Sequence, residues 1–169
     1  MQGCNEAPRS VVSNGYFDVD SLIRLEVAYW DQQSGWLVRE VTLEGETESD
    51  TLQLAPGMLG KELEIFSDIN PAEAKYRNAF EAAVQAGETR YQNVDEVGEL
   101  RELVIRESAD GLVSIAGQLR KETSIYARQQ WLTLVFQDGR LMGFDVKGYQ
   151  KTVASDTARF SVTNRLIRE

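Results

Sequence analysis

The chain of 169 residues contains no histidine and a single cysteine, Cys4. Histidine is the commonest general base and the commonest transition-metal ligand, so its absence excludes the Ser-His-Asp and Cys-His catalytic sets. One cysteine can form neither an internal disulfide nor a zinc cluster. We therefore expect no metal and no cofactor, and we predict that the protein is not an enzyme.

Basic charge and long apolar runs are also scarce. The sequence has 18 lysines and arginines against 27 aspartates and glutamates, which gives a net charge of −9. Nucleic-acid binding requires clustered basic residues, and here they are scattered, so we expect no nucleic-acid partner and a monomeric protein. No segment reaches the roughly 18 consecutive apolar residues of a membrane span. Membrane attachment is therefore expected only through Cys4.

The segment Met1-Gln2-Gly3-Cys4 is followed by polar, patternless sequence. A lone cysteine after glycine, with such a tail behind it, is typical of a bacterial lipoprotein whose apolar signal segment has been replaced by a start methionine. We predict that Cys4 carries the lipid and anchors the protein to the outer membrane, facing the periplasm. The alternative is a free cysteine on a disordered end. Residues 1–14 are predicted to be a flexible tether, and residues 15–169 a single domain.

Helical spacing dominates the first half of the domain. Asp18 is expected to cap a helix over 18–33 that ends at Gly35 in a left-handed conformation. A hairpin with an acidic turn at 44–47 should follow. A second helix is predicted at 59–69, where Leu63 and Phe66 would anchor it on a sheet. Its end is marked by Asp68 or Asn70, which can bind freed backbone groups, and by Pro71.

Alternation of apolar and polar residues dominates the second half. The pattern from Leu100 to Leu166 predicts a meander of about five antiparallel strands, in which Met142, Phe144 and Val146 share one face. Asp110-Gly111 and Asp138-Gly139 are expected to form two-residue hairpin turns. The predicted fold class is α+β, with two N-terminal helices packed on a curved antiparallel β-sheet.

The candidate binding residues are Tyr126, Trp131, Phe144 and Tyr149. The segment from Ser124 to Phe136 is apolar at both alternations, which indicates a strand covered on both faces. By parity, Tyr126 and Trp131 lie on opposite faces, as do Phe144 and Tyr149. Aromatic residues with polar tips suit recognition surfaces. The alternative is that these side chains belong to the core.

One motif carries a resemblance to a known group. Residues Lys61 to Phe66 followed by Asp68-Ile69-Asn70-Pro71 resemble the K-E-L-x-x-F helix and Asp-Ile-Asn-Lys-Pro turn of small lipoproteins of unknown function from Bacteroidetes-type bacteria, although the lysine before the proline is missing here. Similarity continues at 122–130 and 148–150. The resemblance implies an envelope location and a single α+β domain, and it supplies no reaction. It also implies extended structure near Phe80, whereas the alanine-rich residues 71–88 favour helix by propensity.

Three functions remain open at this point. The first is a non-catalytic cell-envelope lipoprotein that binds a protein partner or an apolar ligand. The second is a carrier that encloses a lipid or another small apolar molecule against the sheet. The third is a carboxylate-dependent glycan hydrolase, which would need two facing carboxyl groups, and no spacing in the sequence singles out such a pair.

Overall fold

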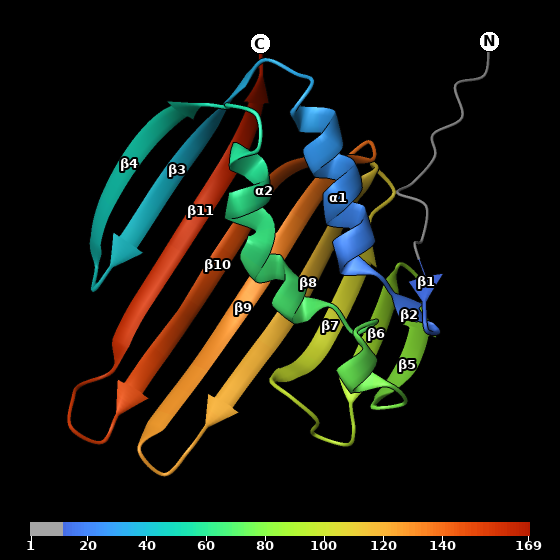
Figure 1. Ribbon diagram of the computed structural model, residues 1–169, viewed down its shortest axis with the longest axis vertical. Coiled ribbons are helices and arrows are strands. Elements are labelled where there is room, and N and C mark those ends of the chain that lie inside the picture. The colour runs from blue at the N-terminus through green and yellow to red at the C-terminus, as the bar shows by residue number, and fades with distance from the viewer. Residues whose placement is uncertain (1–11) are drawn as a thin grey trace.

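The computed structural model describes residues 12–169, so Cys4 and most of the predicted tether lie outside the described residues. Nine strands form one antiparallel sheet in the order β4-β3-β11-β10-β9-β8-β7-β6-β5 (Figure 1). In chain order the strands are β3 (Gly35–Leu43), β4 (Glu46–Gln53), β5 (Phe80–Gln85), β6 (Glu88–Asn93), β7 (Leu100–Glu107), β8 (Leu112–Glu122), β9 (Tyr126–Gln137), β10 (Arg140–Thr152) and β11 (Ala158–Arg168).

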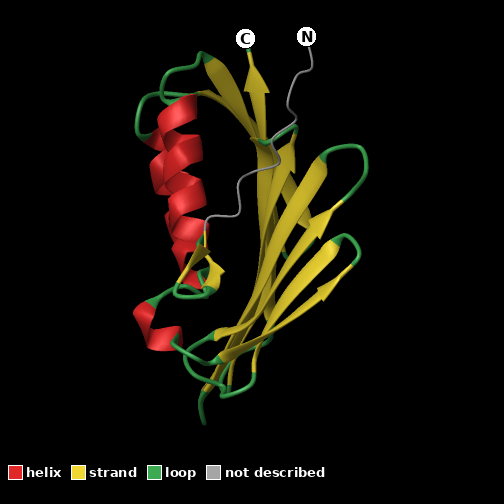
Figure 2. Ribbon diagram, turned by 90° about the vertical axis from the view of Figure 1, so that its right-hand side faces the viewer, coloured by secondary structure: helices red, strands yellow, loops and turns green. Residues whose placement is uncertain are grey.

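The helical segments are short and lie on one side of this sheet (Figure 2). They are α1 (Val19–Trp30), α2 (Met58–Leu63) and the 3₁₀ helices η1 (Glu64–Ile69) and η2 (Ala74–Tyr76). A separate two-stranded ribbon, β1 (Val12–Ser13) with β2 (Tyr16–Phe17), precedes α1.

The predicted α+β class is wrong, because strands hold 56% of the described residues and the protein is mainly β. The two halves of the chain do not divide into a helical layer and a sheet. Instead the early β3–β4 hairpin joins the last strand, β11, and β5 and β6 extend the opposite edge of the same sheet. Helices supply only a thin cover over one face.

The first predicted helix is present, with a different end. The Asp18 side chain accepts a hydrogen bond from the Ser21 backbone N–H at 3.1 Å, which confirms Asp18 as the N-cap. The helix ends at Trp30, and Gly35 begins β3 instead of forming a left-handed stop. A Cβ at Gly35 would lie 2.7 Å from the Ile167 carbonyl oxygen. Glycine is therefore needed here for close strand packing.

The second predicted helix, 59–69, is α-helical only as far as Leu63 and continues as the 3₁₀ helix η1. Leu63, Phe66 and Ile69 are all fully buried. Their spacing of three residues matches the three residues per turn of a 3₁₀ helix, which places all three on the sheet. The tighter helix thus follows from the need to bury every third side chain.

The helix favoured for residues 71–88 is wrong. This segment contains η2 and then β5, which pairs with β6 across a turn at Gly87. Gly87 has a φ of 72°, which favours glycine over a residue with a side chain. The local helical propensity of the alanines is overridden by pairing within the sheet, since propensity is only a weak prior. The extended structure implied near Phe80 is confirmed.

The predicted C-terminal meander is confirmed as β7 to β11, with consecutive strands antiparallel. Asp138-Gly139 forms the expected two-residue turn, and both residues have positive φ. Asp110-Gly111 instead ends a four-residue loop, in which only Gly111 has positive φ. The register of β10 with β9 shifts between Leu141 and Gly143, which marks a β-bulge at Met142. As a result Leu141 is buried and Met142 is 43% exposed, contrary to the predicted alternation.

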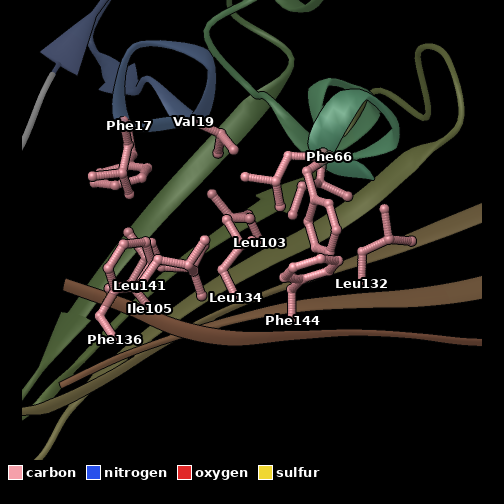
Figure 3. Close-up of a cluster of buried hydrophobic side chains, with 14 of the residues drawn as sticks. Phe17, Val19, Phe66, Leu103, Ile105, Leu132, Leu134, Phe136, Leu141 and Phe144 are labelled. Carbon is pink, nitrogen blue, oxygen red and sulfur yellow. The ribbon is translucent and has the colours of Figure 1, made fainter. Parts of the chain in front are cut away.

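The core lies between the helices and the sheet. The Phe66 and Phe144 rings meet edge to face with centroids 5.8 Å apart, and Figure 3 shows them beside Leu132 and Leu134. Gly117 of β8 lies directly under Ile69, because a Cβ at Gly117 would be 2.5 Å from the Ile69 Cβ. The helical layer therefore rests closely on the middle strands.

Candidate functional site: an aromatic and cationic surface on the open sheet face

The sheet has one face covered by helices and one face that no described element covers (Figure 2). In β9 the side chains of Leu132, Leu134 and Phe136 point under the helices and are buried. Trp131, on the other alternation, lies on the open face and is 41% exposed. Of the two covered faces that the sequence predicts for this strand, the described residues cover one, and cover of the other face by a ligand or a partner stays a prediction.

Two of the predicted site residues meet on this open face. The rings of Trp131 and Tyr149 lie with their centroids 6.4 Å apart and their planes tilted by 50°. Trp131 pairs across the strands with Lys147, and Tyr149 pairs with Gln129. The tyrosine hydroxyl donates a hydrogen bond to the Gln129 side-chain oxygen at 2.9 Å. This bond fixes the tyrosine, and within residues 12–169 no partner takes the two N–H donors of the Gln129 amide.

The bulge at Met142 is what brings these two rings together. The tight turn at 138–139 pairs Arg140 with Gln137. If that register continued, Tyr149 would lie on the face opposite Trp131, because each residue of slip reverses every later side chain. The extra residue in β10 reverses the alternation once. Trp131 and Tyr149 then share the open face, and Phe144 enters the core.

Cationic side chains surround the aromatic pair. Lys147 and Lys151 flank Tyr149 on the same face of β10, and Arg159 of β11 pairs directly with Tyr149. All three cationic residues are exposed, and within residues 12–169 none of them forms an ion pair. The protein as a whole has a net charge of −9. Three uncompensated cations in one patch therefore stand out from the acidic remainder.

A fourth cation in the patch is already occupied. Arg120 of β8 lies across from Gln129 and forms an ion pair with Glu122 at 2.6 Å. The hydrogen bond with the Glu122 carboxylate raises the pKa of the Arg120 guanidinium. We use "Trp131–Tyr149 surface" for the two rings together with the residues that adjoin them on the open face: Gln118, Arg120, Gln129, Lys147, Lys151 and Arg159.

The other predicted site residues lie elsewhere. Phe144 is 2% exposed and packs in the core against Phe66. Tyr126 lies at the start of β9, with its hydroxyl 3.5 Å from the Gln150 side-chain oxygen, and it borders a cleft of about 130 Å³ between two loops. Cys4 lies outside the described residues. The structure thus joins two of the four candidate aromatics, Trp131 and Tyr149.

Sequence reasoning missed the cations and the amide of this surface. The alternation of β10 places Lys147, Tyr149 and Lys151 on one face, so that signal was available within a single strand. The contribution of Gln129 depends on the β9–β10 register, which the bulge changes, and that of Arg159 depends on the β10–β11 register. They could not be assigned from the turn alone.

Two clefts outside this surface have charged walls. One cleft of about 440 Å³ at the β5–β6 turn and one of about 320 Å³ beside β3 both have charged residues in their walls, including Glu88 with Arg106 and Glu40 with Arg165. Such linings do not fit an apolar cargo. Within residues 12–169, no group of three or more aspartate, glutamate, histidine or cysteine side chains is placed to hold a metal ion.

No helix in the described part of the chain combines the length and the apolar character needed to cross a membrane. Comparisons with protein-family models, with curated proteins and with solved structures find no match to this chain.

Proposed function

We propose that the protein is a non-catalytic binding module of the cell envelope that holds an acidic oligosaccharide against the Trp131–Tyr149 surface. The observation that carries this proposal is that two adjacent aromatic rings lie beside three cations that form no ion pair within residues 12–169, on an otherwise acidic protein. Placement at the envelope rests on the predicted lipid at Cys4 and on the resemblance to small lipoproteins.

Each part of the surface matches one part of such a ligand. The C–H face of a sugar ring packs on an exposed tryptophan, and tyrosine adds an apolar body with a polar tip. The amide donors of Gln129 suit sugar hydroxyl groups. Lys147, Lys151 and Arg159 suit the carboxylates of uronic acids, and the protein's own negative charge would repel a polyanion everywhere else. An apolar ligand would leave these cations without a partner.

The non-catalytic part of the proposal rests on the composition of the same surface. Its ionisable groups are four cations and one tyrosine, and the neighbouring carboxylate of Glu122 is paired with Arg120. A glycoside hydrolase needs two carboxyl groups about 5–9.5 Å apart around the bond that breaks. The surface offers a platform for a sugar chain without that pair.

Calorimetric titration with a defined oligouronate tests the function. We expect binding by the wild type and at least about tenfold weaker binding by Trp131→Ala, which corresponds to about 1.4 kcal/mol. Lys147→Ala should weaken binding and reduce its dependence on salt, since that dependence reports the charged contacts. Ile167→Ala is the matched control, because Ile167 is an exposed apolar residue at a distant position on the same face.

Three further measurements sharpen this test. A neutral oligosaccharide of equal length should bind more weakly than the oligouronate, and equal binding would refute the role of the cations. If a single-stranded oligonucleotide binds more tightly than the oligouronate, the proposed ligand is wrong and the surface binds nucleic acid. The oligouronate should be recovered at its original length after incubation, and shortening by the wild type would refute the non-catalytic proposal.

A further inference from the structure

The two edges of the nine-stranded sheet differ in how they are protected. Edge strands expose backbone groups that pair with other chains, and proteins protect them with charges, prolines or bulges. The β4 edge presents Glu46, Glu48 and Asp50, all exposed. The β5 edge presents Glu81 followed by two alanines, Val84 and a glutamine, all exposed, and Val84 is 77% exposed. The β5 edge therefore lacks the protection that β4 has.

The Tyr16 hydroxyl shows which backbone groups of β5 point outward. It donates a hydrogen bond to the Phe80 carbonyl at 3.1 Å and accepts one from the Phe80 N–H at 3.3 Å. Both backbone groups of Phe80 therefore point away from β6. Because directions alternate along an antiparallel strand, the backbone groups of Ala82 and Val84 point outward too. Among residues 12–169, no side chain or strand pairs with the outward groups of Ala82 and Val84.

We propose that β5 pairs with β5 of a second copy of this chain, antiparallel about a two-fold axis at Ala83, so that two sheets become one continuous sheet. In this arrangement Ala82 of each copy lies opposite Val84 of the other, and the outward backbone groups of both residues are satisfied. Glu81 lies opposite Gln85, so no like charges meet.

Tyr16 selects this register. Moving the axis to Ala82 would bring Val84 of the second copy opposite Phe80, whose backbone groups already bind the Tyr16 hydroxyl. The axis at Ala83 gives the longest pairing of the two β5 strands in which the backbone groups of Phe80 keep their hydrogen bonds with the Tyr16 hydroxyl. The β4 edge cannot pair with itself in this way, because Glu46 would face Asp50 and Glu48 would face Glu48, and like charges directly opposite each other are destabilising.

Sedimentation velocity over a range of concentrations tests the pairing. The net charge of −9 on each copy opposes association, so the dimer fraction should rise with protein concentration and with added salt, which screens the repulsion. Ala83→Glu should weaken dimerisation at least tenfold, because two carboxylates would meet at the axis. In one copy alone residue 83 pairs with Arg90, so a glutamate there is compatible with the fold. Ala83→Gln is the neutral control and should still dimerise.

Cysteine cross-linking tests the register. At the axis the two Ala83 residues form a pair whose Cα atoms lie about 4.5 Å apart, within the range for a disulfide. Ala83→Cys in a Cys4→Ser background should form a disulfide-linked dimer under mild oxidation, whereas Glu81→Cys in the same background should not. A wild type that stays monomeric at about 1 mM and high salt, an Ala83→Glu variant that dimerises like the wild type, or equal cross-linking at residue 81 would each overturn the proposal.

Discussion

At the scale of single residues, Asn70 explains why the motif that ends η1 has its particular composition. Its side-chain oxygen accepts hydrogen bonds from the Val19 and Ala72 N–H groups, each at 3.2 Å. Its amide nitrogen donates to Asp18 at 3.2 Å and to Asp20 at 2.9 Å. One buried asparagine therefore joins the start of α1 to the end of η1.

Asn70→Ala should destabilise the protein by about 1–3 kcal/mol, because it leaves the buried Val19 N–H without its partner. Asn70→Asp keeps the acceptor oxygens but removes the donor and places a third carboxylate beside Asp18 and Asp20, so we expect it also to be destabilising. Urea unfolding at neutral pH measures both changes. Ser67→Ala is the control, because Ser67 is exposed on η1. Asn78→Ala would not serve, because Asn78 has positive φ. A loss below about 0.5 kcal/mol for Asn70→Ala would show that the hydrogen bonds of Asn70 contribute little to the stability of the protein.

At the scale of secondary-structure elements, the alternation of apolar residues and the turn residues predict the meander correctly. Local helix propensity gives the wrong prediction where strand pairing determines the structure. The alternating spacing places Leu103 and Ile105 on one face of β7, and Leu132 and Leu134 on one face of β9, and all four side chains are buried. Residues 80–85 are helical by propensity but form an edge strand, because pairing with β6 outweighs propensity. Composition and local propensity do not display this strand, and only the family resemblance indicated extended structure near Phe80.

The candidate site shows the same limit. Parity within β9 and β10 correctly separated Tyr126 from Trp131 and Phe144 from Tyr149. It could not show that Trp131 and Tyr149 share a face, because that depends on one extra residue at Met142. A bulge of this kind leaves no reliable composition signal, so the meeting of the two rings had to be read from the register.

The contact between η1 and β8 leads to a prediction for Gly117. Gly117→Ala should destabilise the protein by about 1–3 kcal/mol, since the added methyl group would overlap Ile69 and push η1 off the sheet. Shortening Ile69 should relieve part of this overlap. Gly117→Ala should therefore cost less stability in an Ile69→Val or Ile69→Ala protein than in the wild type. Denaturant unfolding of the four proteins in each cycle measures this coupling. Strictly additive losses would mean that η1 does not rest on Gly117.

At the scale of the whole molecule, acidic groups stabilise the fold where they receive hydrogen bonds. Glu99, in the loop before β7, binds Lys121 of β8 at 2.9 Å and Arg128 of β9 at 2.6 Å. Burial alone would raise the pKa of Glu99, but the hydrogen bonds from Lys121 and Arg128 outweigh it and hold the pKa below its usual value of 4.5. The pKa of Asp18 is also lowered, because the hydrogen bonds from Ser21 and Asn70 outweigh burial.

These lowered pKa values make the folded protein sensitive to acid. A carboxyl group with a lower pKa in the folded state binds fewer protons than in the unfolded state, so its stabilisation is complete above the unfolded pKa. That stabilisation is lost as the pH falls from about 4.5 through the lower, folded value. We therefore expect the free energy of unfolding to fall steadily below about pH 4.5.

Glu99→Gln should remove part of this sensitivity. At neutral pH the variant should be less stable than the wild type by up to about 1 kcal/mol, a modest effect because Glu99 is partly exposed. The difference should shrink as the pH is lowered towards about 2, where the wild-type carboxyl is itself neutral. Glu107→Gln is the control, because Glu107 is exposed at the end of β7 and, among residues 12–169, forms no ion pair. Urea unfolding curves across this pH range provide the measurement, and a difference that stays constant with pH would mean that Glu99 acts through packing and not through its charge.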